Sequence, residues 1–291
     1  MLVLGFEDYR DQARRLAQAL TVPYAEIEVH HFPDGESRVT LPAKLPQHVI
    51  ICRSLNAPNS KLIELLLTAE TARRSGAETL TLIAPYLCYM RQDIAFHPGE
   101  AVSQKIIGRF LAGLFDRVVT IDAHLHRIGK LDLALPGIRA VNLSAAPLFA
   151  DFLKQRATSP LLVGPDSESA QWVSAIAHTA GYESVVAEKQ RLDDRCVKIS
   201  LPRRNYQGQA IVLIDDVIST GTTLISIADA LFRAGARSID ALVTHALFDV
   251  TTQQKLLSSG IGHLWSTDSI NHPSNTLLLD KLLAEAVNNL E

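Results

Sequence analysis

Two adjacent carboxylates and a small polar segment follow one apolar run in the second half of the chain. Asp215 and Asp216 come directly after residues 210–214, and the polar segment consists of Ser219, Thr220, Gly221, Thr222 and Thr223. Consecutive backbone N–H groups, flanking hydroxyls and the positive end of a helix dipole can together hold a phosphate. The carboxylates would repel that phosphate, so they fit vicinal sugar hydroxyls or a nearby cation. These residue types therefore predict a site for a phosphorylated ribose.

The alternative for these residues is an ordinary turn between a strand and a helix, with aspartate as the helix cap. Residues 210–214 are apolar and mostly β-branched, which predicts a parallel strand covered on both faces. Residues 223–234 place apolar side chains on one helical stripe, and Gly235 ends that helix. Because two adjacent carboxylates at a buried strand end are costly without a ligand, the binding site is the preferred interpretation.

Other polar residues also follow predicted strands. Asp122 and His124 come after the strand-like residues 118–121, and Asp166 comes after residues 161–164. Open α/β sheets bind ligands at such strand ends, so Asp166 can face the same cleft as the carboxylate pair. His124 is interpreted as a metal or phosphate contact, with a structural role as the open alternative.

Three further segments stay ambiguous when taken singly. Residues 30–36 carry an aromatic side chain and two carboxylates, and they also fit a plain Pro-Asp-Gly turn between two strands. Arg91 follows a strand end, where it can bind a phosphate through two hydrogen bonds or form an exposed salt bridge. Residues 187–195 are expected to form a charged, mobile loop, in which Lys189 and Arg191 point the same way if the chain is extended.

Composition limits the class of protein. A chain of 291 residues predicts two domains, and a net charge of −3 argues against a general nucleic-acid surface. Cys52, Cys88 and Cys196 are scattered without CxxC spacing, so neither a disulfide framework nor a zinc site is indicated. No signal-peptide pattern is present, and no apolar run approaches the ~18 residues of a membrane span. A cytoplasmic protein with small-molecule partners is expected.

Similar segments recur about 160 residues apart, a period far too long for a solenoid and suited to two related domains. A strand at residues 2–5 with a helix at 8–20 matches a strand at 161–164 with a helix at 169–180. The copies differ at residues 54–60, which correspond to the polar segment but lack the carboxylate pair. We therefore expect one α/β domain at residues 1–145 that has lost the sugar-phosphate site, and a second at 146–291 that keeps it.

The segment from Asp215 to Thr223 resembles the motif with which type I phosphoribosyltransferases bind 5-phosphoribosyl-1-diphosphate (PRPP). Taken in order, the motifs resemble those of the ribose-phosphate diphosphokinase (PRPP synthase) family along nearly the whole chain. The matching segments are Phe32-Pro-Asp-Gly-Glu36, Arg91-Gln-Asp93, Asp122-Ala-His124, Gly164-Pro-Asp166, Glu188-Lys-Gln-Arg191 and Asp215 to Thr223. Residues 96–103 lack the Ser-Arg-rich pattern of allosterically regulated members, so the chain is more similar to the archaeal type.

This resemblance implies two duplicated type I phosphoribosyltransferase-like α/β domains, each a mostly parallel sheet flanked by helices. It implies transfer of the diphosphoryl group of ATP to ribose 5-phosphate, with Mg²⁺ required, in a homo-oligomer that uses neither nucleic acid nor membrane. The implied ATP contacts are Phe32, Asp34, Gly35, Glu36, Arg91 and Gln92. The implied metal ligands are His124 and Asp166, and the implied catalytic residues are Lys189 and Arg191. The implied ribose 5-phosphate contacts are Arg191, Asp215, Asp216, Ser219, Thr220, Gly221, Thr222 and Thr223.

Two positions depart from the family pattern, and two other functions stay open. Ser219 stands where many members have a third acidic residue, and Thr222 stands where they have a second glycine; both can still donate hydrogen bonds to a phosphate. The first alternative is a phosphoribosyltransferase that consumes PRPP. Such an enzyme needs only one copy of the α/β unit and no ATP-binding unit. The second is a non-catalytic regulatory relative, against which the intact Lys189, Arg191 and His124 count.

Overall fold

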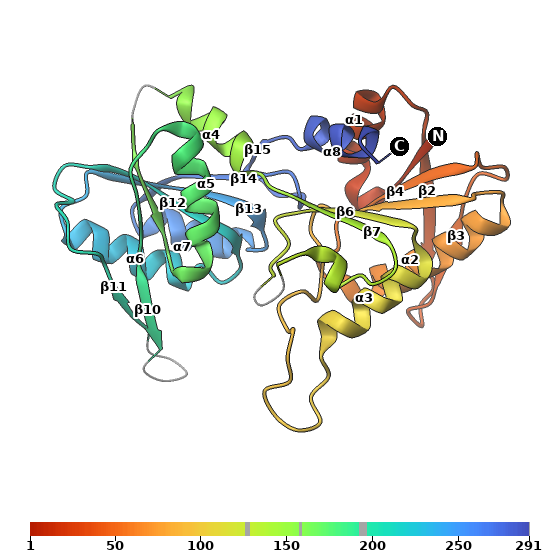
Figure 1. The fold of residues 1–291 in the computed structure, drawn as a ribbon, viewed down its shortest axis with the longest axis horizontal. Coiled ribbons are helices and arrows are strands. Elements are labelled where there is room, and N and C mark those ends of the chain that lie inside the picture. The colour runs from red at the N-terminus through yellow and green to blue at the C-terminus, as the bar shows by residue number, and fades with distance from the viewer. Residues whose placement is uncertain (126–128, 157–158, 192–196, 291) are drawn as a thin grey trace. The chain divides into compact units, whose positions relative to one another are not determined.

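A computed structural model describes residues 1–125, 129–156, 159–191 and 197–290 (Figure 1). The chain forms two compact units. The first unit comprises Met1–Leu143, Ser269–Asn271 and Leu278–Glu291, and the second comprises Ser144–Asp268 and His272–Leu277. Within the described residues, no helix is both long and apolar enough to cross a membrane.

The first unit is built on a seven-stranded sheet with the order β3-β2-β1-β4-β5-β6-β7. All neighbouring strands are parallel except β2 and β3, which are antiparallel. The strands are β1 (Leu2–Phe6), β2 (Tyr24–His31), β3 (Ser37–Thr40), β4 (His48–Cys52), β5 (Thr79–Ile83), β6 (Arg117–Ile121) and β7 (Arg139–Leu143). The helices are α1 (Arg10–Leu20), α2 (Pro58–Arg74), α3 (Ser103–Leu114) and α8 (Asp280–Asn288), with 3₁₀ turns η1 (Glu7–Tyr9) and η2 (Leu131–Leu133).

The second unit is built on a six-stranded parallel sheet with the order β15-β14-β13-β12-β8-β9. Its strands are β8 (Leu161–Gly164), β9 (Ser184–Val186), β12 (Ala210–Ile218), β13 (Ser238–Ala246), β14 (Ile261–Thr267) and β15 (Asn275–Leu277). A separate antiparallel hairpin consists of β10 (Glu188–Arg191) and β11 (Val197–Ser200). The helices are α4 (Ala146–Lys154), α5 (Ala170–Ala180), α6 (Thr222–Arg233) and α7 (Val250–Ser258), with the 3₁₀ turn η3 (Ser167–Ser169).

The two sheets share one strand order, which confirms the predicted duplication. The order β2-β1-β4-β5-β6-β7 in the first unit corresponds to β9-β8-β12-β13-β14-β15 in the second. The β2–β3 and β10–β11 hairpins correspond as well, because they pair residues at equivalent positions of the repeat. Glu28 pairs with Thr40 in the first hairpin, and Glu188 pairs with Ser200 in the second. Residues 188–191 were expected in a loop but form the strand β10. A run of charged residues alone does not indicate a strand, and here β11 supplies the pairing partner. Residues 192–195 of that expected loop lie outside the described residues.

Continuous apolar runs make the central strands, because helices cover both faces of each sheet. Val49, Ile50 and Ile51 of β4 are fully buried. Cys52 and Cys88 are also buried and are free thiols. Burial raises the pKa of the Cys88 thiol to about 12, which keeps it in the unreactive protonated form. Cys196 lies outside the described residues.

The C-terminal helix belongs to the first unit, whereas the sequence-based boundary assigned all of residues 146–291 to the second. Helix α8 packs against α1 (Figure 1). Arg139 holds the end of α8, since its Nη1 and Nη2 donate hydrogen bonds to the carbonyls of Leu290 and Asn289 at 3.2 and 3.1 Å. An internal repeat cannot reveal this docking, because the repeat ends before the final helix.

Candidate functional site

The carboxylate pair lies inside β12 rather than after it. Asp215 pairs with Val243 of β13, and the strand continues through Val217 and Ile218, which pair with His245 and Ala246. The strand is longer than predicted because these two β-branched residues extend the ladder beyond the carboxylates. Asp216 is buried, and its backbone N–H donates a hydrogen bond of 3.0 Å to Oδ1 of Asp215.

Asp166 lies at the end of β8, the neighbour of β12 in the sheet. The chain switches direction between these two strands, since β8 leads to β9 on one side and β12 leads to β13 on the other. Such a switch point is where open α/β sheets bind ligands. Oδ1 of Asp166 accepts hydrogen bonds from the backbone N–H groups of Glu168 and Ser169 at 3.1 and 3.4 Å, which fixes the carboxylate at the start of η3.

Two neighbouring carboxylates act on Asp215. Burial, together with the negative charges of Asp216 and Asp166, raises the pKa of Asp215 well above its usual range. The ionised form of Asp215 is therefore disfavoured in the folded protein. A ligand that donates hydroxyl hydrogens, or a cation bound nearby, would relieve the repulsion. The edge is therefore suited to a sugar diol or a divalent ion.

The polar segment of residues 219–223 follows β12 directly. Ser219, Thr220 and Thr222 are exposed there, and Oγ1 of Thr220 lies 3.2 Å from Oγ1 of Thr222. Gly221 precedes α6, and Ile225 donates the first helical hydrogen bond to the Gly221 carbonyl at 3.0 Å. The earlier backbone N–H groups therefore point out of the helix N-terminus, where the dipole favours an anion.

Gly221 is required at its position for two reasons. Its φ is +71°, in the left-handed region that other residues rarely adopt. A Cβ atom there would also lie 3.1 Å from Cγ2 of Thr252 and 3.2 Å from Cδ2 of Leu256, both on α7. The segment thus approaches α7 closely at Gly221.

The turn at residues 32–36 connects β2 and β3 of the first unit. The N–H of Phe32 donates to the Glu36 carbonyl at 2.8 Å, and the N–H of Gly35 donates to the Phe32 carbonyl at 2.9 Å. Oδ1 of Asp34 accepts from the Glu36 N–H at 3.2 Å. Phe32 is 39% exposed; its ring makes an edge contact with the His30 ring, with centroids 4.8 Å apart, and a partly exposed aromatic ring can stack on a ligand. We call residues 32–36 the 32–36 turn.

Arg91 and Gln92 lie in the irregular segment between β5 and α3. Gln104 of α3 holds this segment, because its N–H donates to the Gln92 carbonyl at 3.1 Å and its Nε2 donates to the Met90 carbonyl at 3.0 Å. Gln104 is buried, whereas Arg91 is exposed. Gln104 was not predicted as a site residue, because in the sequence it is one more polar residue on a helix.

The chain bends sharply after β6, where Asp122 and His124 lie. Asp122 is buried with a φ of +39°, and its N–H donates to the Leu143 carbonyl at 2.8 Å. The N–H of Ala123 donates to Oδ1 of Asn142 at 2.9 Å. These two bonds fix a strained bend to β7, and His124 follows it in a half-buried position.

Lys189 and Arg191 lie on β10, opposite Ile199 and Val197 of β11. Among the described strands, β10 pairs with β11 alone, so the hairpin is not part of the six-stranded sheet (Figure 1). The residue before the hairpin is fixed to the six-stranded sheet. Ala187 is buried, and its N–H donates a hydrogen bond of 2.9 Å to the carbonyl of Gly164 in β8.

The comparisons with known proteins agree with this geometry. Residues 1–114 match the N-terminal domain of ribose phosphate pyrophosphokinase, and residues 138–258 match a phosphoribosyl transferase domain. The chain is 34% identical to the ribose-phosphate pyrophosphokinase of Methanopyrus kandleri, with 100% of this chain and 99% of that one covered. It is 31% identical to ribose-phosphate pyrophosphokinase 2 of Archaeoglobus fulgidus, with 94% and 96% covered.

A solved structure shows the same fold. The phosphoribosylpyrophosphate synthetase of Mycobacterium smegmatis superposes with a TM-score of 0.86 over 99% of this chain and 98% of that one, at 22% identity. Two duplicated units, a carboxylate pair beside a helix N-terminus, and full-length sequence relatives lead to one assignment. The chain belongs to the ribose-phosphate pyrophosphokinase family.

Proposed function

We infer that this chain transfers the diphosphoryl group of ATP to the anomeric hydroxyl of ribose 5-phosphate, giving PRPP and AMP. The observation that carries this inference is the edge of the second sheet, where a carboxylate pair stands beside an exposed helix N-terminus. This edge offers acceptors for sugar hydroxyls and donors for a phosphate within one short segment. Relatives that match the chain over its full length are named ribose-phosphate pyrophosphokinase.

In the proposed reaction, the anomeric oxygen attacks the β-phosphorus of ATP. A bond forms between these two atoms, the bond from the β-phosphorus to the oxygen shared with the α-phosphorus breaks, and AMP leaves. The attacking hydroxyl releases its proton to solvent. Asp215 and Asp216 would hold the ribose hydroxyls, and residues 219–223 would hold the 5-phosphate. The protein contributes mainly position and positive charge, as in other phosphoryl transfers.

We propose that ATP is bound by the first unit, through Phe32, Asp34, Gly35, Glu36, Arg91 and Gln92. The exposed Phe32 ring supports this proposal because an aromatic face can stack on the adenine base. Exposed Arg91 can bind a phosphate through two parallel hydrogen bonds.

We propose His124 and Asp166 as ligands for Mg²⁺, which would neutralise phosphate charge when bound. The described residues contain no cluster of three His, Cys, Asp or Glu side chains arranged for a metal. Mg²⁺ is commonly held by one or two protein groups together with substrate phosphates. The raised pKa of Asp215 also supports a cation near Asp166. Binding of Mn²⁺ to the two single alanine variants, followed by electron paramagnetic resonance, measures these contributions.

Purified protein supplied with ATP, Mg²⁺ and ribose 5-phosphate is expected to form AMP and PRPP in equal amounts, which phosphorus NMR resolves. Reactions without ribose 5-phosphate are the control and should release little AMP. A protein that makes nucleotide from PRPP and a free base, but no PRPP from ATP, would be a phosphoribosyltransferase. A protein inactive in both reactions would be a regulatory relative.

Each chain is expected to bind one ribose 5-phosphate. The second unit has the Asp215 pair, whereas residues 54–60 of the first unit lack such a pair. Isothermal titration calorimetry measures this stoichiometry directly. Two equivalent sugar-phosphate sites per chain would contradict the division of roles between the units.

We also propose that the protein is a cytoplasmic homo-oligomer. Ile63 and Leu67 lie one turn apart on α2 and are 55% and 37% exposed, and apolar side chains grouped on a surface often mark subunit contacts. Analytical ultracentrifugation of the purified chain measures its oligomeric state.

A further inference from the structure

The first unit has an arginine where the second has its sugar-binding carboxylate. Strand β4 pairs with β1 through Leu2 and Val49, and β12 pairs with β8 through Leu161 and Ile211. Because β1 corresponds to β8 and β4 to β12, counting along the strands places Arg53 at the position of Asp215. The switch point of the first sheet therefore contains a cation of the protein's own.

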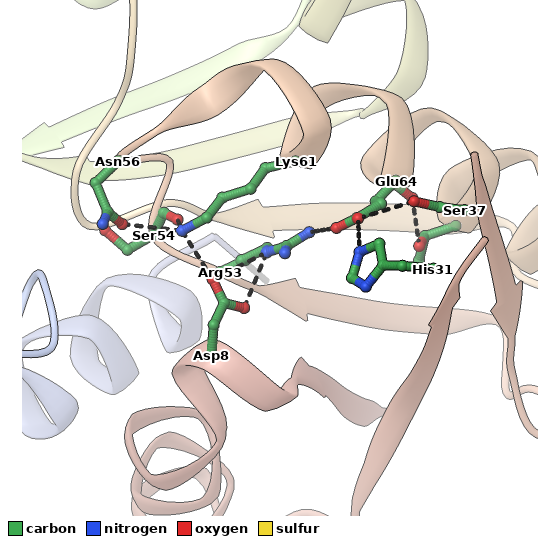
Figure 2. Close-up of polar contacts among 9 residues, drawn as sticks. Asp8, His31, Ser37, Arg53, Ser54, Asn56, Lys61 and Glu64 are labelled. Atoms are coloured by element: carbon green, nitrogen blue, oxygen red, sulfur yellow. Dashed lines mark hydrogen bonds and ion pairs between the residues drawn. The ribbon is translucent and has the colours of Figure 1, made fainter. Parts of the chain in front are cut away.

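Arg53 is buried and is held by two carboxylates (Figure 2). Its Nε donates to Oδ1 of Asp8 at 3.1 Å, and its Nη1 donates to Oε2 of Glu64 at 2.5 Å. The guanidinium also lies over the Phe6 ring, with Cζ 3.9 Å from the ring centroid. Nζ of Lys61 lies 2.7 Å from the second oxygen of Asp8. This ion network fills the position where the second unit is proposed to bind a sugar.

The second oxygen of Glu64 connects this network to the 32–36 turn. Oε1 of Glu64 lies 2.9 Å from Nε2 of His31 and accepts a hydrogen bond of 3.1 Å from Oγ of Ser37. His31 and Ser37 are paired across β2 and β3; His31 is the last residue of β2 before the turn, and Ser37 is the first residue of β3 after it. One carboxylate on α2 thus holds both ends of the 32–36 turn, as Figure 2 shows.

Glu64 is held in its ionised form. Burial alone would raise the pKa of its carboxyl, but the hydrogen bonds from Arg53 and His31 outweigh burial and lower that pKa. The side chain is only 1% exposed, so it cannot contact a ligand itself. Any effect of Glu64 on ATP must therefore pass through the residues that it holds.

We propose that Glu64, fixed by Arg53, is a positioning residue that sets the 32–36 turn for ATP binding. This inference rests on the proposed function, in which Phe32, Asp34, Gly35 and Glu36 of the turn contact ATP. In this view, the site that the first unit lost became a rigid support for the nucleotide turn. In the first unit, internal ion pairs occupy the position at which the second unit is proposed to bind its substrate.

The test is Glu64→Gln, which keeps the shape of the side chain and removes its charge. Loss of the ion pair with Arg53 loosens the turn, so we expect the KM for ATP to rise about tenfold. The KM for ribose 5-phosphate and kcat should stay within about twofold, because the second unit and the reacting groups are unchanged. Glu70→Gln is the matched control, since Glu70 is an exposed residue of the same helix; it should change neither KM.

Ser37→Ala is the second variant, and it tests the positioning role of Glu64 if Glu64→Gln does not fold. It removes one hydrogen bond to Glu64, so we expect the KM for ATP alone to rise about threefold. Where both variants fold, the double variant should show less than the product of the two effects, because both act through one carboxylate. Equal increases in both KM values, or none, in an active protein would overturn the positioning role. A wild-type protein that makes no PRPP would overturn the proposed function and this inference with it.

Discussion

Replacement of Lys189 by alanine is expected to lower the turnover number by about 10²- to 10⁴-fold, with little change in either KM. Negative charge spreads over the transferring and leaving oxygens as the diphosphoryl group moves, and a cation placed there stabilises the transition state more than the bound substrates. A residue with this role lowers kcat and kcat/KM by similar factors.

The position of Lys189 in the fold supports such a role. Its strand pairs with β11 alone among the described strands, and a lone two-stranded hairpin is only marginally stable. The backbone of Lys189 can therefore change position more easily than that of a residue in the six-stranded sheet. A group that reaches the reacting atoms only after such a movement contributes to the transition state and little to initial binding.

Steady-state kinetics with both substrates varied will measure the effect of Lys189→Ala. Lys198→Ala is a matched control, because Lys198 is a lysine of the same hairpin, at the position opposite Gln190. We expect Arg191→Ala to behave like Lys189→Ala, with some additional loss of ribose 5-phosphate affinity, since a guanidinium can bind a phosphate bidentately. An unchanged kcat with a raised KM in Lys189→Ala would instead assign Lys189 to substrate binding.

The sequence predicted the elements whose signals are local. The apolar run at 210–214 and the helical stripe that follows it are visible in any window of that length, and both elements are present as β12 and α6. The repeat predicted two sheets of the same kind, and the shared strand order confirms it. Asp166 and Asp215 come together at one edge because both lie near the carboxyl ends of neighbouring parallel strands.

The ion network of the first unit could not be predicted in this way. Arg53, Asp8, Glu64 and His31 come from four separate elements, and ion pairs between them leave no periodic pattern in the sequence. Arginine and glutamate are also rarely buried unless they are paired, so composition alone places both at the surface. A strand-by-strand alignment of the two repeats could have indicated a functional role for Arg53, because it matches Arg53 with Asp215.

Replacement of Asp215 by asparagine is expected to weaken ribose 5-phosphate binding about 10- to 100-fold, while it stabilises the ligand-free protein. The affinity falls because an amide accepts weaker hydrogen bonds from sugar hydroxyls than a carboxylate does. The stability rises because burial and the charges of Asp216 and Asp166 disfavour the ionised form of Asp215. We expect a gain of about 0.5–2 kcal/mol in the free energy of unfolding near neutral pH.

The pH dependence of this gain follows from the direction of the pKa shift. The pKa of Asp215 lies above its ordinary value of 3.8 in the folded protein. Below that ordinary value both the folded and the unfolded chain carry the proton, so the group does not affect stability. As the pH rises toward the folded pKa, the unfolded chain loses the proton first, and the wild-type protein is progressively destabilised. The asparagine variant has no such proton to lose, so its advantage should grow with pH across this window.

Urea unfolding from pH 4 upward, with calorimetric titration of ribose 5-phosphate, will measure both effects of Asp215→Asn. Asp151→Asn is the control, because Asp151 is an exposed residue of the same unit and should change neither quantity. A variant that lost affinity without gaining stability would show that the carboxylates are compensated in the free protein. A variant that gained stability and kept its affinity would show that Asp215 does not contact the sugar. Only the opposite movement of the two quantities fits a carboxylate that is kept strained for its substrate.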